Sequence, residues 1–337
     1  MSSPMSVFWD PRCEVHTVPR GFPERPERLQ LALPYLRERG WDLVEAGSGG
    51  PVGGMVGQSR RLAGLVHDPG YIERMEAAVA DVAELAAKGD FPRRPTPMLD
   101  TNDNPLSPGT ADAAWAAVDA ALAAGDHVML GAGHRAMSVT RPPGHHCERD
   151  RAMGFCYLNQ IAVLAQGLID VHGLERIAIL DFDVHHGNGT QHLFDQRADV
   201  AYLSVHQYPF YPGTGAASER GIGEGEGTTV NAPLPAGSGD DVYGEVMADL
   251  LLPAVRSFDP DVLLVSAGFD AWRNDPIAGM ELTEESFHRF GVDLAELAEE
   301  ICDGRLVSVL EGGYDLNALP RLIDAYLRGT VGTSLDA

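Results

Sequence analysis

Residues 177–189 read IAILDFDVHHGNG, an apolar run that leads directly into acidic and imidazole side chains. The run is short and apolar throughout, which is typical of a parallel strand that is buried on both faces. In an extended chain, side chains two positions apart face the same way, so Asp181, Asp183 and His185 project together. This stretch therefore predicts a buried strand that ends in a cluster of ionisable groups.

Short apolar runs of this kind recur along the chain and alternate with helical patterns. The runs predict strands over residues 6–9, 127–130, 136–139, 177–180, 200–205, 262–266 and 306–310. The patterns between them predict helices over residues 71–87, 110–124, 157–171, 242–257, 284–301 and 316–328. Thr283, followed by two glutamates, is the expected N-cap of the fifth helix. The alternation predicts an α/β fold in which a parallel sheet is covered by helices on both faces.

Two irregular segments interrupt this alternation. Residues 90–108 are rich in Pro, Asn and Asp, and residues 207–227 are rich in Gly, Pro and aromatic side chains. Long irregular loops in a compact domain are usually functional or disordered. The regular pattern resumes after each loop without a change in composition, so we predict a single domain over residues 1–337.

The overall charge limits the classes of partner. The formal net charge is −24, which argues against nucleic acid because phosphate binding needs a basic face. The acidity either keeps the protein in solution or attracts cationic substrates, and composition alone does not choose between the two. No apolar run approaches the ~18 residues of a membrane span, so we expect no membrane partner.

The N-terminal residues and the cysteines indicate the cellular compartment. Residues 1–12, MSSPMSVFWDPR, lack the basic and then apolar stretches of a signal peptide. The cysteines show no C-x-x-C spacing and are expected to be reduced. We therefore expect a cytoplasmic protein, with a homo-oligomer left open. The residues concerned are Cys13, Cys147, Cys156 and Cys302.

Three further strand predictions also run into reactive side chains. The strand over 136–139 leads to His145 and His146, the strand over 262–266 leads to Asp270, and the strand over 306–310 leads to Tyr314. In open parallel sheets the ligand crevice lies outside the carboxyl ends of the strands. We therefore expect these side chains to meet the Asp/His cluster at one edge of the sheet.

A divalent cation would compensate the charges gathered there. Asp183, His185 and Asp270 offer the carboxylate and imidazole ligands of a catalytic zinc site, which takes three protein ligands and a water. Such a metal polarises an amide carbonyl and activates the water. Fe(II) accepts the same ligands, so the native metal stays open. The alternative is an Asp/His cluster that only closes a turn through hydrogen bonds.

The remaining side chains complete an amide hydrolase. Two carboxylate ligands leave a bound water less acidic than an all-imidazole site would, so a general base is needed. His145 and His146 supply the acid/base pair. The Tyr314 hydroxyl can donate to the oxyanion of the tetrahedral intermediate. Asp181 would orient His145 from behind.

Several short motifs resemble those of the histone deacetylase family, which includes bacterial acetylpolyamine amidohydrolases. The resemblance covers residues 16–316, most of the chain. It implies the arginase–deacetylase fold, an eight-stranded parallel sheet flanked by helices, together with the zinc ligands, histidine pair and tyrosine given above. The motifs are RPPGHH at 141–146, DFDVHHGNGT at 181–190, YPGTG at 211–215, SAGFDA at 266–271 and EGGY at 311–314.

The resemblance also implies a substrate tunnel and structural ions. Phe155 and Tyr211 would be its aromatic walls, and Gly154 would contact the substrate through its backbone. A structural potassium ion would lie among Asp181, Asp183, His185, Ser204 and Val205, largely held by carbonyls. A second potassium ion would lie among Phe194, Arg197, Val200 and Thr228.

Two departures from the family pattern bear on subclass and substrate. Many family members have Asp at the position of Asn188, whereas Asn resembles the class II branch. We predict that the Asn leaves His146 less basic than an Asp would. The apolar Ile277 lies at the expected gate of the tunnel and favours acetyl-lysine-like or broader substrates over acetylated polyamines. Asp100 and Asp103 could supply acid at the rim, but we interpret them as turn-forming.

Three other functions are compatible with parts of this pattern. An arginase-type enzyme with two manganese ions would need further ligands around Asp270, and SAGFDAW offers a single carboxylate. A catalytically silent binding protein would be expected to lack a ligand or Tyr314, and both are present. A hydrolase that acts on a different amide keeps the same site and stays open.

Overall fold

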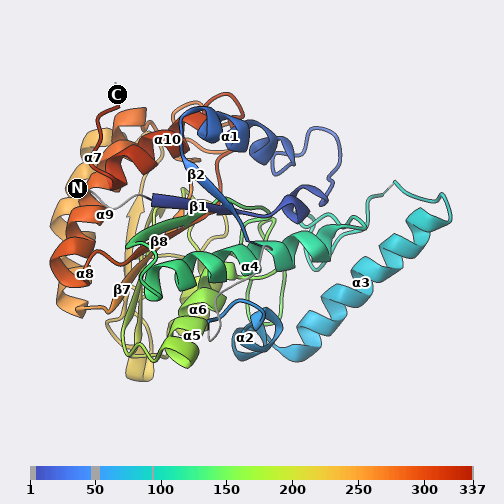
Figure 1. The fold of residues 1–337 in the computed structure, drawn as a ribbon, viewed down its shortest axis with the longest axis horizontal. Coiled ribbons are helices and arrows are strands. Elements are labelled where there is room, and N and C mark those ends of the chain that lie inside the picture. Colours follow the sequence, from blue (N-terminus) through green and yellow to red (C-terminus); the bar gives the residue numbers. More distant parts are fainter. Residues whose placement is uncertain (1–4, 47–53, 93–94, 336–337) are drawn as a thin grey trace.

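A single eight-stranded sheet forms the centre of the molecule (Figure 1). The computed structural model of the protein describes residues 5–46, 54–92 and 95–335. All neighbouring strands pair in parallel, in the order β2-β1-β3-β8-β7-β4-β5-β6. The strands are β1 (Met5–Trp9), β2 (Asp42–Glu45), β3 (Arg135–Ser138), β4 (Ile177–Asp181), β5 (Val200–Gln207), β6 (Thr229–Leu234), β7 (Val262–Ala267) and β8 (Leu306–Leu310).

Helices cover both faces of this sheet, as the alternation predicts (Figure 1). Side chains of one strand alternate between two separate cores: Leu180 faces one and Ile179 the other. The first core is completed by α1 and α7 to α10, and the second by α2 to α5. The helices are α1 (Glu27–Glu38), α2 (Ser59–Val66), α3 (Pro69–Ala87), α4 (Thr110–Met129), α5 (Gln160–His172), α6 (Asn188–Phe194), α7 (Asp240–Val246), α8 (Leu252–Phe258), α9 (Glu284–Ile301) and α10 (Leu319–Thr330).

The strand predicted over residues 127–130 is wrong, because these residues end the long helix α4. A short apolar run cannot be assigned to strand or helix by periodicity alone. Gly125 lies inside α4 and does not end it. A Cβ at this position would lie 2.5 Å from Leu164 Cδ1, on α5. The glycine thus allows α4 and α5 to pack closely.

The edge strands β2 and β6 and the helices α1, α2 and α6 were not predicted. β2 is only partly buried, so it lacks the apolar run that marks the central strands. The helix predicted over 242–257 is confirmed, but a π-helical turn, Met247–Leu251, separates α7 from α8. Thr283 precedes α9 as expected, although its hydroxyl donates to Asp240 and does not cap the helix.

The two predicted irregular segments are largely irregular in the structure. Residues 207–227 contain one 3₁₀ turn, Gly223–Gly225, and residues 93–94 of the other loop lie outside the described residues, as do residues 1–4 of the N-terminal segment. The four cysteines are buried and free of disulfides. In the described parts of the chain, no helix is long and apolar enough to cross a membrane.

Candidate active site

The central four strands carry the predicted site. β3, β8, β7 and β4 are neighbours in the sheet, and each leads into one reactive loop at its carboxyl end. Asp183 follows β4, Asp270 follows β7 and Tyr314 follows β8. The parallel arrangement therefore brings together side chains that are far apart in the sequence, where such folds bind ligands.

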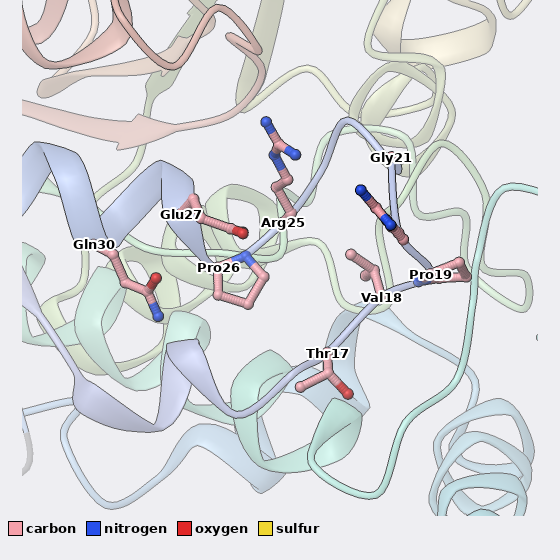
Figure 2. Close-up of a pocket in the computed structure, with 9 residues that line it drawn as sticks. Thr17, Val18, Pro19, Gly21, Arg25, Pro26, Glu27 and Gln30 are labelled. Atoms are coloured by element: carbon pink, nitrogen blue, oxygen red, sulfur yellow. The ribbon is translucent and has the colours of Figure 1, made fainter. Parts of the chain in front are cut away.

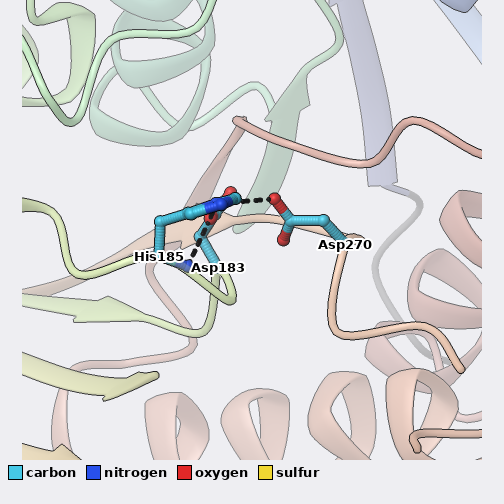
Figure 3. A group of neighbouring side chains, drawn as sticks. All are labelled: Asp183, His185 and Asp270. Carbon is cyan, nitrogen blue, oxygen red and sulfur yellow. Dashed lines mark hydrogen bonds and ion pairs between the residues drawn. The ribbon is translucent and has the colours of Figure 1, made fainter. Parts of the chain in front are cut away.

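Asp183, His185 and Asp270 form a buried group whose ligand atoms all lie within 4.8 Å of one another (Figure 3). His185 Nδ1 lies 3.1 Å from Asp183 Oδ1 and 3.1 Å from Asp270 Oδ2. A single ring N–H can only be shared weakly between the two oxygens, whereas a cation placed among the three atoms interacts with all of them. The donor set and its geometry fit a divalent metal such as zinc.

Two glycines leave room for the carboxylates of this group. A Cβ at Gly268 would lie 2.1 Å from Asp183 Oδ2, and one at Gly312 would lie 2.1 Å from Asp270 Oδ2. The Gly312 N–H also donates to Asp183 Oδ2 at 2.7 Å. The wall beside the carboxylates must therefore be bare backbone.

The two carboxyl groups of this cluster differ in acidity. Burial opposes ionisation of Asp183, but the nearby His145 and His185 hold the pKa of its carboxyl below the usual range. Burial and the charge of Asp183 raise the pKa of Asp270. The two carboxylates repel each other when both are ionised, and a divalent cation between them would offset that repulsion.

His145 and His146 lie side by side, with ring centroids 4.1 Å apart. His145 Nδ1 is 3.0 Å from Asp181 Oδ2, and His146 Nδ1 is 2.8 Å from Asn188 Oδ1. The predicted partners behind each ring are therefore in contact with it. Each ring keeps its Nε2 free of these partners.

The environment separates the titration of the two histidines. Burial disfavours a charged ring in both, but Asp183 and Asp181 raise the pKa of His145 to about 10. Burial and the charge of His145 lower the pKa of His146 well below its usual value. Such divergence is typical of paired groups that divide acid and base roles.

Tyr314 faces the same pocket. Burial raises the pKa of its phenol well above the usual range, so the hydroxyl keeps its proton and can donate it in a hydrogen bond. Its backbone N–H donates to Asp275 Oδ2 at 2.8 Å. The guanidinium of the buried Arg28 lies 5.0 Å from the centre of the Tyr314 ring.

A pocket of about 260 Å³ is lined by His146, His185 and Tyr314. The four predicted substrate residues line it: Gly154, Phe155, Tyr211 and Ile277. Gly154 and Phe155 both have positive φ, 58° and 68°. A Cβ at Gly154 would lie 2.2 Å from His146 Cδ2. A positive φ strains the backbone at Phe155, and strained residues are concentrated at functional sites.

Sequence reasoning missed part of this lining. Asp103, interpreted as turn-forming, lines the pocket, and its Oδ2 accepts from Tyr211 Oη at 3.0 Å and from the Gly154 N–H at 3.3 Å. Phe210 stacks on His185, with ring centroids 5.3 Å apart. Asp100 lies at a turn, with φ of 59°, and accepts from the Ala152 N–H. No local pattern distinguishes the two aspartates.

Buried arginines behind the site were also missed. Arg141 is fully buried and donates from two nitrogens to the Glu24 carboxylate. Arg28 donates to Oε1 of Glu24 and to the backbone carbonyls of Glu311 and Gly313. The loops that carry the histidine pair and Tyr314 are thus joined through one ion-pair network.

A second pocket, of about 300 Å³, lies at the start of α1 (Figure 2). Backbone and side chains of residues 17–30 line it, including Arg20 and Arg25. It contains no predicted site residue. The candidate active site is therefore the smaller pocket, which His185 lines together with His146 and Tyr314.

Within each of the two predicted potassium sites, several of the residues are in contact or share a strand. Asp181 pairs with Ser204 across the sheet, and the Asp183 N–H donates to Asp181 Oδ1. In the second group, the Arg197 N–H donates to the Phe194 carbonyl, and Thr228 Oγ1 donates to the Arg197 carbonyl. Val205 and Val200 lie on β5. Both ions stay predictions.

An all-parallel α/β fold with a buried carboxylate–imidazole group at the carboxyl ends of its strands is an arrangement that suits a hydrolase with a bound metal. Comparison with known proteins makes this specific: residues 22–330 match the histone deacetylase domain. The chain belongs to the histone deacetylase family. The solved structure titled "Crystal Structure of HDA15 HD domain" aligns with a TM-score of 0.85 and 30% identity, covering 99% of this chain and 90% of that one. The predicted arginase–deacetylase fold is confirmed.

Two curated relatives show the range of the family. "Histone deacetylase 14, chloroplastic" of Arabidopsis thaliana is 39% identical over 79% of this chain and 62% of the relative. "Polyamine deacetylase HDAC10" of Homo sapiens is 37% identical over 93% of this chain and 44% of the relative. The matched part is less than two thirds of either relative's length.

Proposed function

We propose that the protein is a zinc-dependent deacylase that hydrolyses an N-acyl amide of the acetyl-lysine type, with residues 1–337 forming its single catalytic domain. The observation that carries this is that His185, which forms a buried group with Asp183 and Asp270, lines the same pocket as His146 and Tyr314. When bound there, zinc would polarise the amide carbonyl and make a water more acidic.

The chain's own residues supply the proton transfers. Neutral His146 accepts a proton from the attacking water at Nε2, and cationic His145 beside it stabilises the developing negative charge. The pair then returns a proton to the leaving amine. Tyr314 donates its hydroxyl hydrogen to the oxyanion, and Asp181 keeps His145 oriented.

The pocket favours a narrow, linear substrate. Phe155 and Tyr211 stand on its walls, and Ile277 adds an apolar side chain. The Gly154 backbone would contact the acyl amide. An acylated lysine side chain suits this lining because its alkyl stem contacts the aromatic rings. Structural potassium ions at the two predicted groups would hold the loops around β4 and β5.

An acetylated polyamine is the second candidate. Asp103 places a carboxylate in the pocket lining, which could pair with a polyamine ammonium group. A relative named as a polyamine deacetylase supports this alternative. Hydrolysis of another small-molecule amide needs the same catalytic groups. Buried, unpaired thiols support a cytoplasmic location for either reaction.

A parallel assay tests the proposal. Zinc-loaded protein is given acetyl-lysine peptides, acetylated polyamines and trifluoroacetylated lysine substrates, and its metal content is measured. We expect release of acetate with the highest kcat/KM on the lysine substrates. Inactivity of fully loaded protein towards all three classes would overturn the deacylase proposal.

A further inference from the structure

A line of four polar side chains leads from the pocket to the surface. His146 Nδ1 is 2.8 Å from Asn188 Oδ1, and Asn188 Nδ2 donates to the Glu148 carboxylate. The two carboxylate oxygens of Glu148 lie 2.8 and 3.1 Å from His192 Nδ1. His146 and Asn188 are buried, whereas the side chains of Glu148 and His192 are 20% and 42% exposed.

The directions of these hydrogen bonds follow from Glu148. An ionised carboxylate only accepts, so the NH₂ group of Asn188 must face Glu148 and its Oδ1 must face His146. The 3.3 Å bond from Asn188 Nδ2 to the His146 carbonyl supports the same orientation. His146 must then carry its proton on Nδ1, which leaves Nε2 as an acceptor. A reversed amide would place the proton on Nε2 and remove that acceptor.

The two catalytic histidines therefore have different supports. His145 contacts the Asp181 carboxylate directly, at 3.0 Å. His146 contacts an amide, and the carboxylate stands one residue further away. Hydrogen bonds that run in one direction polarise one another, so part of the negative charge of Glu148 is transmitted to the His146 ring.

We propose that Glu148 and His192 are positioning residues that act on His146 through Asn188. Glu148 fixes His146 in the Nδ1–H tautomer and stabilises its ring when Nε2 takes up a proton. His192 holds the Glu148 carboxylate and adjusts its effective charge. The proposal rests on the proposed function, because it assigns these residues to the proton acceptor of that reaction.

His192 gives this line access to bulk solvent. The charged groups that act on it are all acidic: Glu148 from the loop after β3, Asp195 at the end of α6, and Glu219 from the loop after β5. The hydrogen bond to Glu148 raises the pKa of His192 above its usual value. A protonated His192 neutralises Glu148, whereas a neutral ring keeps the Nδ1–H bond and leaves the charge to act on Asn188.

A reciprocal exchange of the amide and the carboxylate tests the proposal. Glu148→Gln removes the carboxylate charge at position 148. Asn188→Asp places a second carboxylate next to Glu148, and the two repel each other. The double variant restores one carboxylate and one amide in reversed order, with the carboxylate at position 188 and therefore next to His146. We expect kcat to fall roughly 10-fold in each single variant and to return to within about 3-fold of wild type in the double variant.

Three controls separate this effect from general damage. Glu224→Gln makes the same charge change at an exposed residue and should leave kcat unchanged. His192→Gln keeps a donor without titration, so one ionisation should disappear from the kcat–pH profile. Zinc content and far-UV circular dichroism identify any variant that does not fold, in which case the remaining variants carry the test.

Nitrogen chemical shifts of the His146 ring give a readout without turnover. In zinc-loaded wild type we expect a protonated Nδ1 and an unprotonated Nε2, and in Glu148→Gln a mixture of the two neutral tautomers. Single variants with wild-type kcat and unchanged shifts, or a double variant no better than the product of its singles, would overturn the proposal. If wild type hydrolyses no acyl amide, the proposed function fails, while the shifts still test the hydrogen-bonded line.

Discussion

The carboxylate of Asp275 accepts the backbone N–H of Tyr314 at 2.8 Å. Its other oxygen accepts the N–H of Ile277 at 3.0 Å. One buried side chain thus joins the loop at the gate of the pocket to the loop that carries the oxyanion donor. A change in either loop is transmitted to the other.

Asp275→Asn tests this connection. Asparagine has one acceptor oxygen, so one of the two N–H groups loses its partner. We expect kcat to fall roughly 10- to 100-fold with a smaller change in KM, as steady-state kinetics on zinc-loaded protein would measure. Asp81→Asn, on the exposed face of α3, is the matched control. A wild-type kcat in Asp275→Asn would contradict the positioning role.

Glu311→Gln should change how stability depends on pH. Glu311 accepts from the N–H groups of Gly144 and His145, and burial raises the pKa of its carboxyl to about 7. A carboxyl whose folded pKa is raised binds its proton more tightly when folded, so its contribution is complete below about 4.5 and is lost as pH rises through about 7.

Urea unfolding of the metal-free proteins at several pH values measures this effect. Wild type should lose up to about 3 kcal/mol more than Glu311→Gln between pH 4.5 and 7.5, because glutamine keeps an acceptor oxygen and does not titrate. Groups that do not interact with Glu311 cancel in the difference, whereas His145, whose pKa Glu311 helps to raise, contributes to it. Parallel curves for the two proteins would show that Glu311 is already ionised throughout this range.

Removal of the metal should abolish activity and lower stability together. We expect a chelator to inactivate the protein, and one zinc per chain to restore activity and raise Tm. Asp270→Asn removes the charge of a proposed ligand. Its amide oxygen can still accept the Val184 N–H, which lies 2.9 Å from Asp270 Oδ1 in the wild type. It should bind zinc weakly and lose at least about 100-fold in kcat. Full activity at full zinc occupancy in this variant would refute the ligand assignment.

Ile277→Glu should change substrate preference. Ile277 lines the pocket, so a carboxylate there would meet the ammonium groups of a polyamine but not the neutral backbone of a peptide. We expect the ratio of kcat/KM for acetylated polyamine over acetyl-lysine peptide to rise roughly 10-fold, about 1.4 kcal/mol. Ile277→Gln, of similar size without charge, is the control. An equal rise in both variants would assign the effect to size or polarity and not to charge.

The central strands and the clustering of Asp183, His185 and Asp270 could be predicted because most of their determinants are local. β4 is an apolar run, and Asp183 and His185 follow it at the spacing of an extended chain. Parallel pairing then brings in Asp270 and Tyr314. The edge strand β2 lacks such a run, so its position depends on pairing with β1 and not on its own pattern.

The contacts that support the catalytic groups could not be predicted in this way. Asp103 meets Tyr211 across 108 residues of sequence, and Glu148 meets Asn188 across 40. Neither carboxylate occupies a position whose local pattern differs from that of a surface residue. Their roles follow only from the way the loops close over the ends of the strands.

The sequence separation of the proposed ligands sets the stage of synthesis at which a metal site can form. His185 and Asp270 are 85 residues apart, and the Gly312 N–H that holds Asp183 is 129 residues beyond it. Until the ribosome has passed Asp270, the nascent chain contains only Asp183 and His185 of the three. A zinc site at these residues would therefore be completed late in synthesis, and a product truncated before Asp270 would contain two ligands without the third.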